Sequence, residues 1–247
     1  MKLMIVRHGE PDYSIDSLTP KGWREAELLA KRLSKLDIKD FYVSPLGRAQ
    51  DTASFTLKKM GRQAKVLPWL HEFDAPMRKP NYPEKDTVTW DWLPQDWMAD
   101  ERFFHYDQWL ENEYMQKYGV KEKYDQVIQK FDQFMEGYGY KREGHFYRVV
   151  KANHDLVVLC CHFGLECVLL SHLLGVSPMI LWHNTCVLPS AVTLLISEER
   201  KKGIGAFRMN YMGDISHLYA GNEEPSFAVR FCETCLLYTS PSPRDRG

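Results

Sequence analysis

The chain has 247 residues, of which 44% are hydrophobic and 26% are charged, and its formal net charge at pH 7 is −1. This composition is typical of a globular protein with a sizeable core, and the length fits one generous domain or a domain with a large insertion. The balanced charge argues against nucleic acid as the main partner. No apolar run approaches the ~20 residues that span a bilayer, and no signal-peptide pattern is present, so we expect a cytoplasmic protein without membrane association.

A short buried strand is predicted at the N-terminus, where the four apolar residues 3–6 lead directly into Arg7-His8-Gly9. Ligands of α/β sheets bind beyond the carboxyl ends of the strands, so Arg7 and His8 are expected at such a position. As a working hypothesis, His8 is a nucleophile that becomes phosphorylated.

Helix and strand signals alternate through the next part of the chain. Thr19-Pro20 is typical of a helix start, with threonine as the N-cap, and apolar residues then recur at helical spacing. Residues 41–43 predict a second strand, which runs into Ser44-Pro45, a second cap-and-proline signal, and then into Arg48. Two strand-to-helix junctions that each carry an arginine indicate a shared anion site, because helix N-termini favour anions.

Residues 66–73 predict a third strand, whose end offers Glu72. Residues 74–153 differ in character, because aromatic residues are mixed there with prolines and charges and strand alternation is missing. Within them, residues 121–138 form an amphipathic helix. We interpret this segment as a largely helical insertion over one edge of the sheet. Core packing is the favoured role of its aromatic residues, and the alternative is that some of them line a substrate pocket.

The clearest buried strand covers residues 156–161 and stops at His162-Phe163-Gly164. A helix is predicted for residues 165–174, ended by Gly175. His162 therefore repeats the topology of His8, in which an apolar strand, a histidine, a glycine and a helix follow one another.

The end of the chain divides into two late strands and a tail. Residues 191–196 and 206–212 predict the strands, paired antiparallel through a turn at 201–203, whereas residues 235–247 are rich in proline and serine and predict a disordered, non-native tail. We expect one domain over residues 1–234, a three-layer α/β/α fold with a mostly parallel central sheet and the aromatic insertion capping its site.

Six cysteines do not make a disulfide framework in a chain of this size. Cys160 and Cys161 lie in an apolar run, which is typical of buried thiols. Cys232 and Cys235 form a lone C-x-x-C pair, and no second pair is spaced to complete a zinc site. A structural or incidental role is therefore expected for this pair.

The strand-end residues suit the transfer of a phosphoryl group. Two arginines, Arg7 and Arg48, can grip its equatorial oxygens, and His162 adds a further cation or donor. The surrounding positive charge keeps His8 neutral, the state in which an imidazole attacks phosphorus. Glu72 can give a proton to the departing oxygen. Because the cations are side chains, we expect neither a metal nor a cofactor.

Four segments in the same order resemble the motifs of the histidine phosphatase superfamily, which has the phosphoglycerate mutase-like fold. These segments are Arg7-His8-Gly9, Ser44 to Ala53, Leu70-His71-Glu72 and Cys161-His162-Phe163-Gly164. The resemblance spans residues 2–212 and implies that His8 is the phosphorylated nucleophile and that Arg7, Arg48 and His162 bind the phosphoryl oxygens. It also implies that Glu72 is the general acid, with Asp74 and Glu84 as alternatives, and that the insertion forms a cap over the substrate.

The chain departs from the family pattern at two places. Glu10-Pro11-Asp12-Tyr13 stands where many members carry a threonine or serine and later an asparagine, and an acidic residue there repels phosphate unless it points away. Phe163 stands where a small residue is common. Asn184, just before a late strand, is a candidate for a polar contact to the phosphate, although loop residues are usually solvated.

Three functions follow as hypotheses. The first is a metal-independent phosphomonoester hydrolase that acts on a small phosphorylated metabolite through a phosphohistidine. The second is a phosphoglycerate mutase, which needs a clamp for the substrate carboxylate, with Arg78 and Lys79 as candidates. The third is a phosphate-binding protein without turnover.

Overall fold

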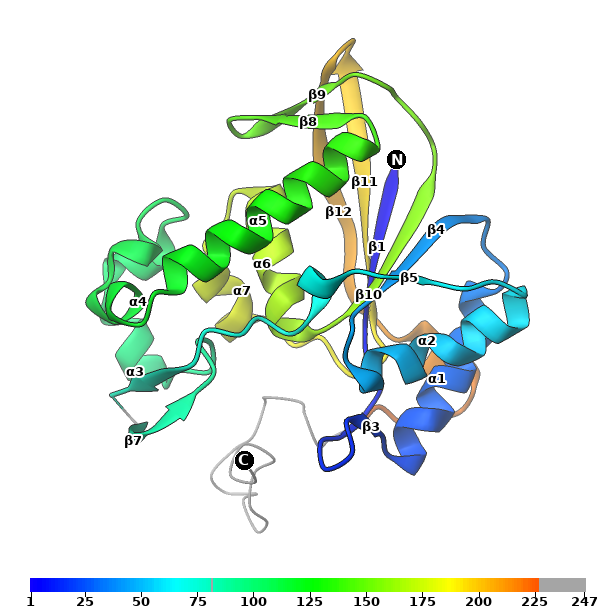
Figure 1. Cartoon of the computed structure of the whole chain (residues 1–247), viewed down its shortest axis with the longest axis horizontal. Coiled ribbons are helices and arrows are strands. Elements are labelled where there is room, and N and C mark those ends of the chain that lie inside the picture. The colour runs from blue at the N-terminus through cyan, green and yellow to red at the C-terminus, as the bar shows by residue number, and fades with distance from the viewer. Residues whose placement is uncertain (81, 227–247) are drawn as a thin grey trace.

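A mixed eight-stranded sheet forms the middle layer of the protein, in the order β5-β4-β10-β1-β11-β12-β9-β8 (Figure 1). The computed structural model describes residues 1–80 and 82–226. Four adjacent strands run parallel: β5 (Lys65–Val66), β4 (Ile38–Val43), β10 (Leu156–Cys161) and β1 (Lys2–Arg7). The other four continue antiparallel: β11 (Val192–Lys201), β12 (Ile204–Asp214), β9 (Phe146–Val149) and β8 (Tyr140–Glu143).

The central strand β1 is buried on both faces, as its apolar run predicts. Leu3 and Ile5 belong to one core cluster, whereas Met4 and Val6 belong to the cluster on the opposite face. Successive side chains of a strand point to opposite faces, so a strand covered on both sides must be apolar throughout. The fully buried pattern of β10 has the same origin.

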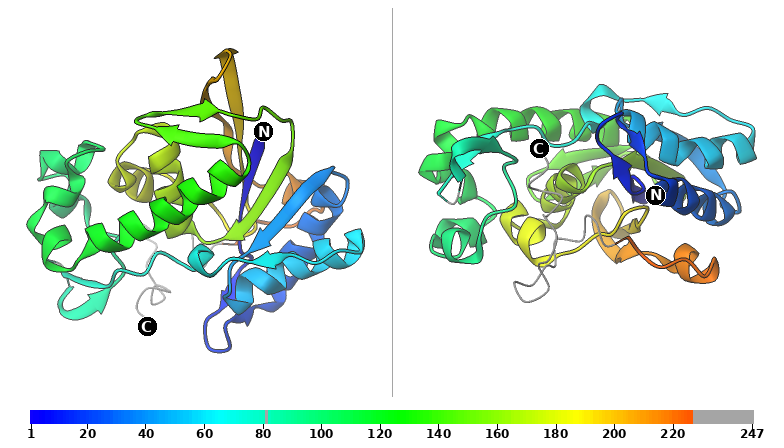
Figure 2. Two further views of the ribbon diagram at one scale, coloured as in Figure 1. Left: turned by 45° about the horizontal axis from the view of Figure 1, so that its top comes forward. Right: turned by 90° about the horizontal axis from the view of Figure 1, so that it is seen from below.

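Helices cover both faces of the sheet (Figure 1, Figure 2). On one face lie α1 (Pro20–Leu33) and α2 (Gly47–Met60), with α8 (Ser216–Ala220) against α1. On the other lie α5 (Val120–Gly137), α6 (Phe163–Leu174) and α7 (Pro178–Asn184). This confirms the predicted three-layer α/β/α fold with mostly parallel central strands.

Most predicted helix ends are confirmed, but the second helix begins differently. The side chain of Thr19 accepts from the Gly22 N–H, and Gly175 ends α6 at φ 67°. The interpretation of Ser44 as the cap of α2 was wrong, because that helix begins at Gly47. Its first N–H is instead bound at 2.7 Å by the carboxylate of Asp16, which comes from a small hairpin of β2 (Pro11–Asp12) and β3 (Ser17–Leu18).

The predicted strand over residues 66–73 was wrong beyond Val66. The last bond of that ladder runs from the Leu67 N–H to the Val43 carbonyl, and a 3₁₀ turn, η1 (Pro68–Leu70), follows. Pro68 has no N–H to continue the pairing and a fixed φ that suits a turn. Glu72 therefore lies in a loop after η1.

The insertion contains two β-hairpins as well as helices, so its prediction as largely helical was only partly right. Its elements are β6 (Met77–Lys79), β7 (Tyr82–Thr87), α3 (Pro94–Trp97), η2 (Glu101–Phe104), η3 (Trp109–Glu111), α4 (Glu113–Lys117), α5, β8 and β9. Helix α5 confirms the predicted amphipathic helix. The β8–β9 hairpin extends the main sheet through β12, a pairing between residues far apart in sequence.

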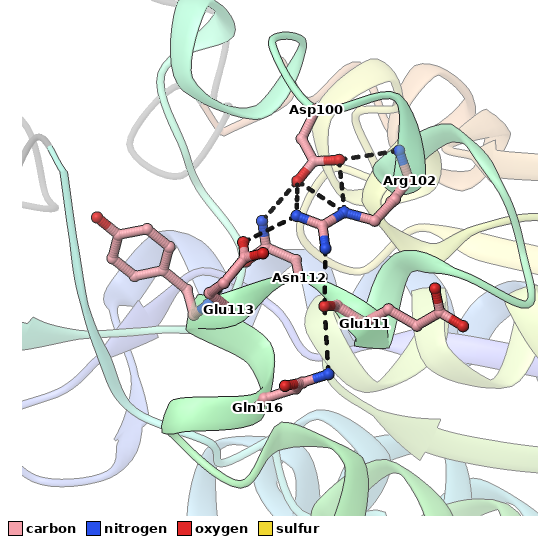
Figure 3. A network of polar contacts seen from close by, with 7 residues as sticks. Asp100, Arg102, Glu111, Asn112, Glu113 and Gln116 are labelled. Atoms are coloured by element: carbon pink, nitrogen blue, oxygen red, sulfur yellow. Dashed lines mark hydrogen bonds and ion pairs between the residues drawn. The ribbon is translucent and has the colours of Figure 1, made fainter.

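A polar network fixes the outer part of the insertion (Figure 3). Arg102 donates to both carboxylate oxygens of Asp100, to Glu113 at 2.8 Å and to the Glu111 carbonyl at 2.9 Å. Asn112 donates to Asp100 as well. Hydrogen bonds from the Arg102 side chain lower the pKa of Asp100 to about 2.

The late strands β11 and β12 confirm the predicted antiparallel pair. Cys160 and Cys161 are buried free thiols, as their apolar surroundings predict. The C-x-x-C pair at 232–235 and the tail at 235–247 lie outside the described residues. Within the described part, no helix has the length and apolar character needed to cross a bilayer.

Candidate active site

Two histidines meet where the parallel strands β1 and β10 end. Arg7, the last residue of β1, pairs with Cys161, the last residue of β10. The next residues, His8 and His162, are therefore neighbours, and their ring centroids are 5.1 Å apart. Both side chains are buried. Strand register thus creates the pair that the repeated strand-histidine-glycine pattern predicts.

His8 is held in one tautomer and is kept neutral. Its Nδ1 lies 2.7 Å from the carbonyl oxygen of Gly9, which only accepts, so Nδ1 carries the proton and Nε2 keeps its lone pair. Burial, followed by the charges of Arg7 and Arg48, lowers the pKa of His8 well below its usual value. A neutral imidazole with a free Nε2 is a competent nucleophile.

Two arginines contribute positive charge beside His8. Arg7 is buried, donates to the Val187 carbonyl, and has its guanidinium 5.5 Å from the centre of the Phe163 ring. Arg48 donates to Asp16 at 2.6 Å and lies 5.4 Å from the centre of the Tyr13 ring. The hairpin that caps α2 therefore also positions Arg48.

His162 is oriented by Ser44 at the end of β4. The Ser44 hydroxyl lies 2.7 Å from Nε2 of His162 and also accepts from the Leu46 N–H. Nδ1 of His162 is buried and has no hydrogen-bond partner among the described residues. Burial and the neighbouring His8, Arg48 and Arg7 hold the pKa of His162 well below its usual value, so the neutral ring offers one nitrogen to a ligand.

Glu72 lies at the N-terminus of α6. Its carboxylate accepts from the Leu165 N–H at 2.9 Å and the Phe73 N–H at 2.8 Å. Burial raises the pKa of Glu72, although these N–H donors, Arg48 and Arg7 oppose the shift. A raised pKa favours the protonated form that a general acid needs. The two alternatives, Asp74 and Glu84, are exposed.

In the loop after His8, the residue Glu10 is held against α1 and its N-cap. Glu10 accepts from the Thr19 hydroxyl at 2.8 Å, and its backbone N–H donates to the carboxylate of Glu25 at 2.8 Å. The backbone of this loop packs directly on α1, where a Cβ on Gly22 would lie 2.2 Å from the Glu10 carbonyl oxygen. The first departure from the family pattern therefore brings no carboxylate of Glu10 toward the site.

Phe163 is accommodated by turning its ring into the core. It is buried and packs edge to face on Trp90, with ring centres 5.7 Å apart. Next to it, a Cβ on Gly164 would lie 2.4 Å from the indole nitrogen of Trp90 and 2.8 Å from a carboxylate oxygen of Glu72. The insertion therefore reaches the first turn of α6 through Trp90.

Three predicted candidates lie apart from this cluster. Asn184 is the last residue of α7 and is exposed, and no hydrogen bond between described residues joins it to His8, Arg7 or Arg48. Lys79 is buried and donates to the backbone carbonyls of Trp90 and Asp91. Arg78 pairs with Asp86 in the outer hairpin.

Several residues that shape the site were not predicted as such. Thr52 accepts from the Gly9 N–H at 2.8 Å and donates to the Arg48 carbonyl at 2.7 Å, and so joins the two loops that carry His8 and Arg48. Its sequence signal is its place four residues after Arg48, one helical turn away. Asp16 carries no comparable signal, because its partners are about 30 residues away.

No group of three or more His, Cys, Asp or Glu side chains is placed to hold a metal ion in the described ranges.

The chain was compared with known proteins. A sequence profile of the histidine phosphatase superfamily (branch 1) matches residues 3–208.

Curated relatives match only parts of the chain. The 2,3-bisphosphoglycerate-dependent phosphoglycerate mutase of Thermoplasma acidophilum is 45% identical over 64 residues, covering 22% of this chain and 32% of the relative. The mitochondrial serine/threonine-protein phosphatase Pgam5 of Caenorhabditis elegans is 40% identical over 62 residues, which cover 24% of this chain and 22% of the relative. The match therefore spans less than a third of the length of either relative.

Solved structures match over most of the chain at low identity. Phosphoserine phosphatase from Entamoeba histolytica, in complex with phosphoserine, has a TM-score of 0.54 and 17% identity, covering 88% of this chain and 98% of its own. A mycobacterial glucosyl-3-phosphoglycerate phosphatase has a TM-score of 0.53 and 18% identity, and the match covers 86% of this chain and 98% of its own. These likenesses show a shared fold. Because the family profile covers most of the chain, including every strand-end residue of the site, the chain belongs to the histidine phosphatase superfamily (branch 1).

Proposed function

We propose that the chain is a phosphomonoester hydrolase that acts on a small phosphorylated metabolite through a phosphohistidine on His8. The observation that carries this proposal is the bond from Nδ1 of His8 to the Gly9 carbonyl, which leaves Nε2 unprotonated beside two arginines. One structural relative, phosphoserine phosphatase, supports a small ligand, since it was solved with phosphoserine and with 3-phosphoglyceric acid.

The reaction divides into two in-line displacements. In the first, Nε2 of His8 attacks phosphorus, the P–O bond to the leaving group breaks, and Glu72 gives its proton to the departing oxygen. In the second, the Glu72 carboxylate takes a proton from water as the water oxygen attacks phosphorus, and the P–N bond returns its electron pair to His8. Arg7, Arg48 and His162 stabilise the phosphoryl oxygens in both steps.

The test compares wild type with His8→Ala, using the exposed His154→Ala as a matched control. Phosphate release from a panel of phosphate esters is expected from wild type and the control, and loss of release is expected from His8→Ala. An alkaline quench of wild type should retain an acid-labile phosphoenzyme that His8→Ala lacks. Equal turnover by wild type and His8→Ala would refute the proposal, and a chelator is expected to leave turnover unchanged.

Phosphoglycerate mutase activity is the second candidate, favoured by the partial identity to curated mutases. A mutase must hold the substrate carboxylate while the phosphoryl group returns to it. Arg78 and Lys79 are engaged elsewhere in the insertion, which favours hydrolysis. Measuring phosphate release against interconversion of phosphoglycerates distinguishes the two activities.

A further inference from the structure

A buried carboxylate, Glu166, lies in the first turn of α6, four residues after His162. Its N–H donates to the His162 carbonyl at 2.9 Å, and its side chain is fully buried. The hydroxyl of Thr193 on β11 donates to Oε1 of Glu166 at 2.5 Å and itself accepts from the Gly213 N–H. Oε2 is buried without a hydrogen-bond partner among the described residues.

Glu166 shares its surroundings with the arginine that ends β1. The titratable groups that interact with it are Arg7, Glu72, Cys161 and Cys167. Burial raises the pKa of Glu166 to about 7, and the Thr193 hydrogen bond and the charge of Arg7 oppose the shift. Glu166 therefore changes charge near neutral pH, and Arg7 is the cation that stabilises its ionised form.

We infer that Glu166 is a positioning residue that balances the charge of Arg7 in the empty site and takes up one proton when a phosphate dianion binds. The inference rests on the proposed function, because it needs an anion at Arg7. A bound dianion and an ionised Glu166 compete for the same guanidinium, so the dianion favours the protonated carboxyl. Thr193 then holds the neutral acid through the same hydroxyl.

Proton uptake by Glu166 makes the affinity for a dianion fall as pH rises. Below the pKa of Glu166 in the free protein the group is already protonated, and binding is independent of pH. Above it, binding requires a proton, so affinity for a dianion falls by about tenfold per pH unit. Glu166→Gln keeps a side-chain oxygen for Thr193 but cannot ionise, and it should remove this dependence.

The experiment uses tungstate, a phosphate mimic that stays a dianion above neutral pH, and titration calorimetry in buffers of different ionisation enthalpy. At about pH 8, Glu166→Gln should take up about one proton fewer per tungstate than wild type. Glu72→Gln is the matched control, since it removes the other carboxylate beside Arg7 and should retain the uptake. Thr193→Val removes a bond that favours the ionised form, and should reduce uptake just above neutral pH.

The outcomes distinguish the role of Glu166 from the proposed function. Equal proton uptake by wild type and Glu166→Gln overturns the role of Glu166 while leaving the phosphate site intact. Loss of uptake in Glu72→Gln also overturns it. If Glu166→Gln does not fold, an unchanged pH dependence in Thr193→Val overturns it. A wild type that does not bind tungstate contradicts the proposed function itself.

Discussion

His8 and Glu72 lie in one buried site, yet their surroundings favour the neutral form of both. Burial and two arginines lower the pKa of the histidine, whereas burial raises the pKa of the glutamate against the pull of the same arginines. The shifts favour an unprotonated nucleophile and a protonated acid, which is the combination that opens the proposed reaction.

At the residue scale, Glu72→Gln should separate substrates by their leaving groups. Hydrolysis of an alkyl phosphate should fall by about 10²–10⁴-fold, because the alkoxide cannot leave without a proton. Hydrolysis of 4-nitrophenyl phosphate should fall much less, because nitrophenolate is a stable anion. Steady-state kinetics on both esters checks this.

The exposed Asp74→Asn and Glu84→Gln serve as controls for Glu72→Gln, since both residues were alternatives for the acid. Neither should change the ratio of the two rates. A large loss with either control, or an equal loss on both esters for Glu72→Gln, would assign the proton to another group.

At the element scale, the contact between α1 and the loop after His8 depends on Gly22. Gly22→Ala places a Cβ against the Glu10 carbonyl and should destabilise the fold by about 1–3 kcal/mol. Because the displaced loop follows directly after His8, KM for a phosphate ester should rise in the same variant. Denaturant unfolding and kinetics measure the two effects.

Gly137→Ala in α5 is the matched control for Gly22→Ala, because a Cβ there meets nothing within 4 Å. As the last residue of α5 it should change the stability by less than about 1 kcal/mol, with unchanged KM. Similar behaviour of the two variants would mean that the approach of α1 to the loop is not what positions His8.

Elements with a strong local pattern could be predicted from the sequence. The apolar runs of β1 and β10 and the periodicity of α1 and α5 are signals carried by each segment itself. The β8–β9 hairpin could not be predicted in this way, because it pairs with β12, about 57 residues further along the chain. The strand-end residues Arg7, His8 and His162 follow from local patterns, whereas Asp16 and Glu166 acquire their roles only through distant partners.

At the scale of the whole molecule, two buried carboxyls lie on opposite sides of the sheet. Glu25 belongs to α1 and Glu166 to α6, and burial raises the pKa of each to about 7. A carboxyl with a raised pKa binds its proton more tightly in the folded state, so its contribution to stability falls as pH rises from about 4.5 to 7. Histidines held neutral by burial, such as His183 with a pKa of about 4, oppose this trend by favouring the fold as pH rises toward 6.5.

Glu25→Gln isolates the carboxyl contribution, because the histidines are unchanged. The variant keeps an oxygen for the Glu10 N–H, and its free energy of unfolding relative to wild type should increase by roughly 2–3 kcal/mol between pH 5 and pH 8. Denaturant unfolding at both pH values checks this. A difference that does not vary with pH would mean that Glu25 is not protonated in the folded protein.

The packing of Trp90 against the first turn of α6 has a consequence for fluorescence. Its indole packs on Phe163, and a Cβ on Gly164 would meet both the indole nitrogen and a carboxylate oxygen of Glu72, the group that would exchange a proton in each step. The fluorescence of an indole responds to a change of charge in a neighbouring group. The chain has seven tryptophans, so Trp90→Phe defines the background against which this signal is read. The fluorescence of Trp90 should therefore change as the site fills and empties, which would allow binding to be followed in real time without a label.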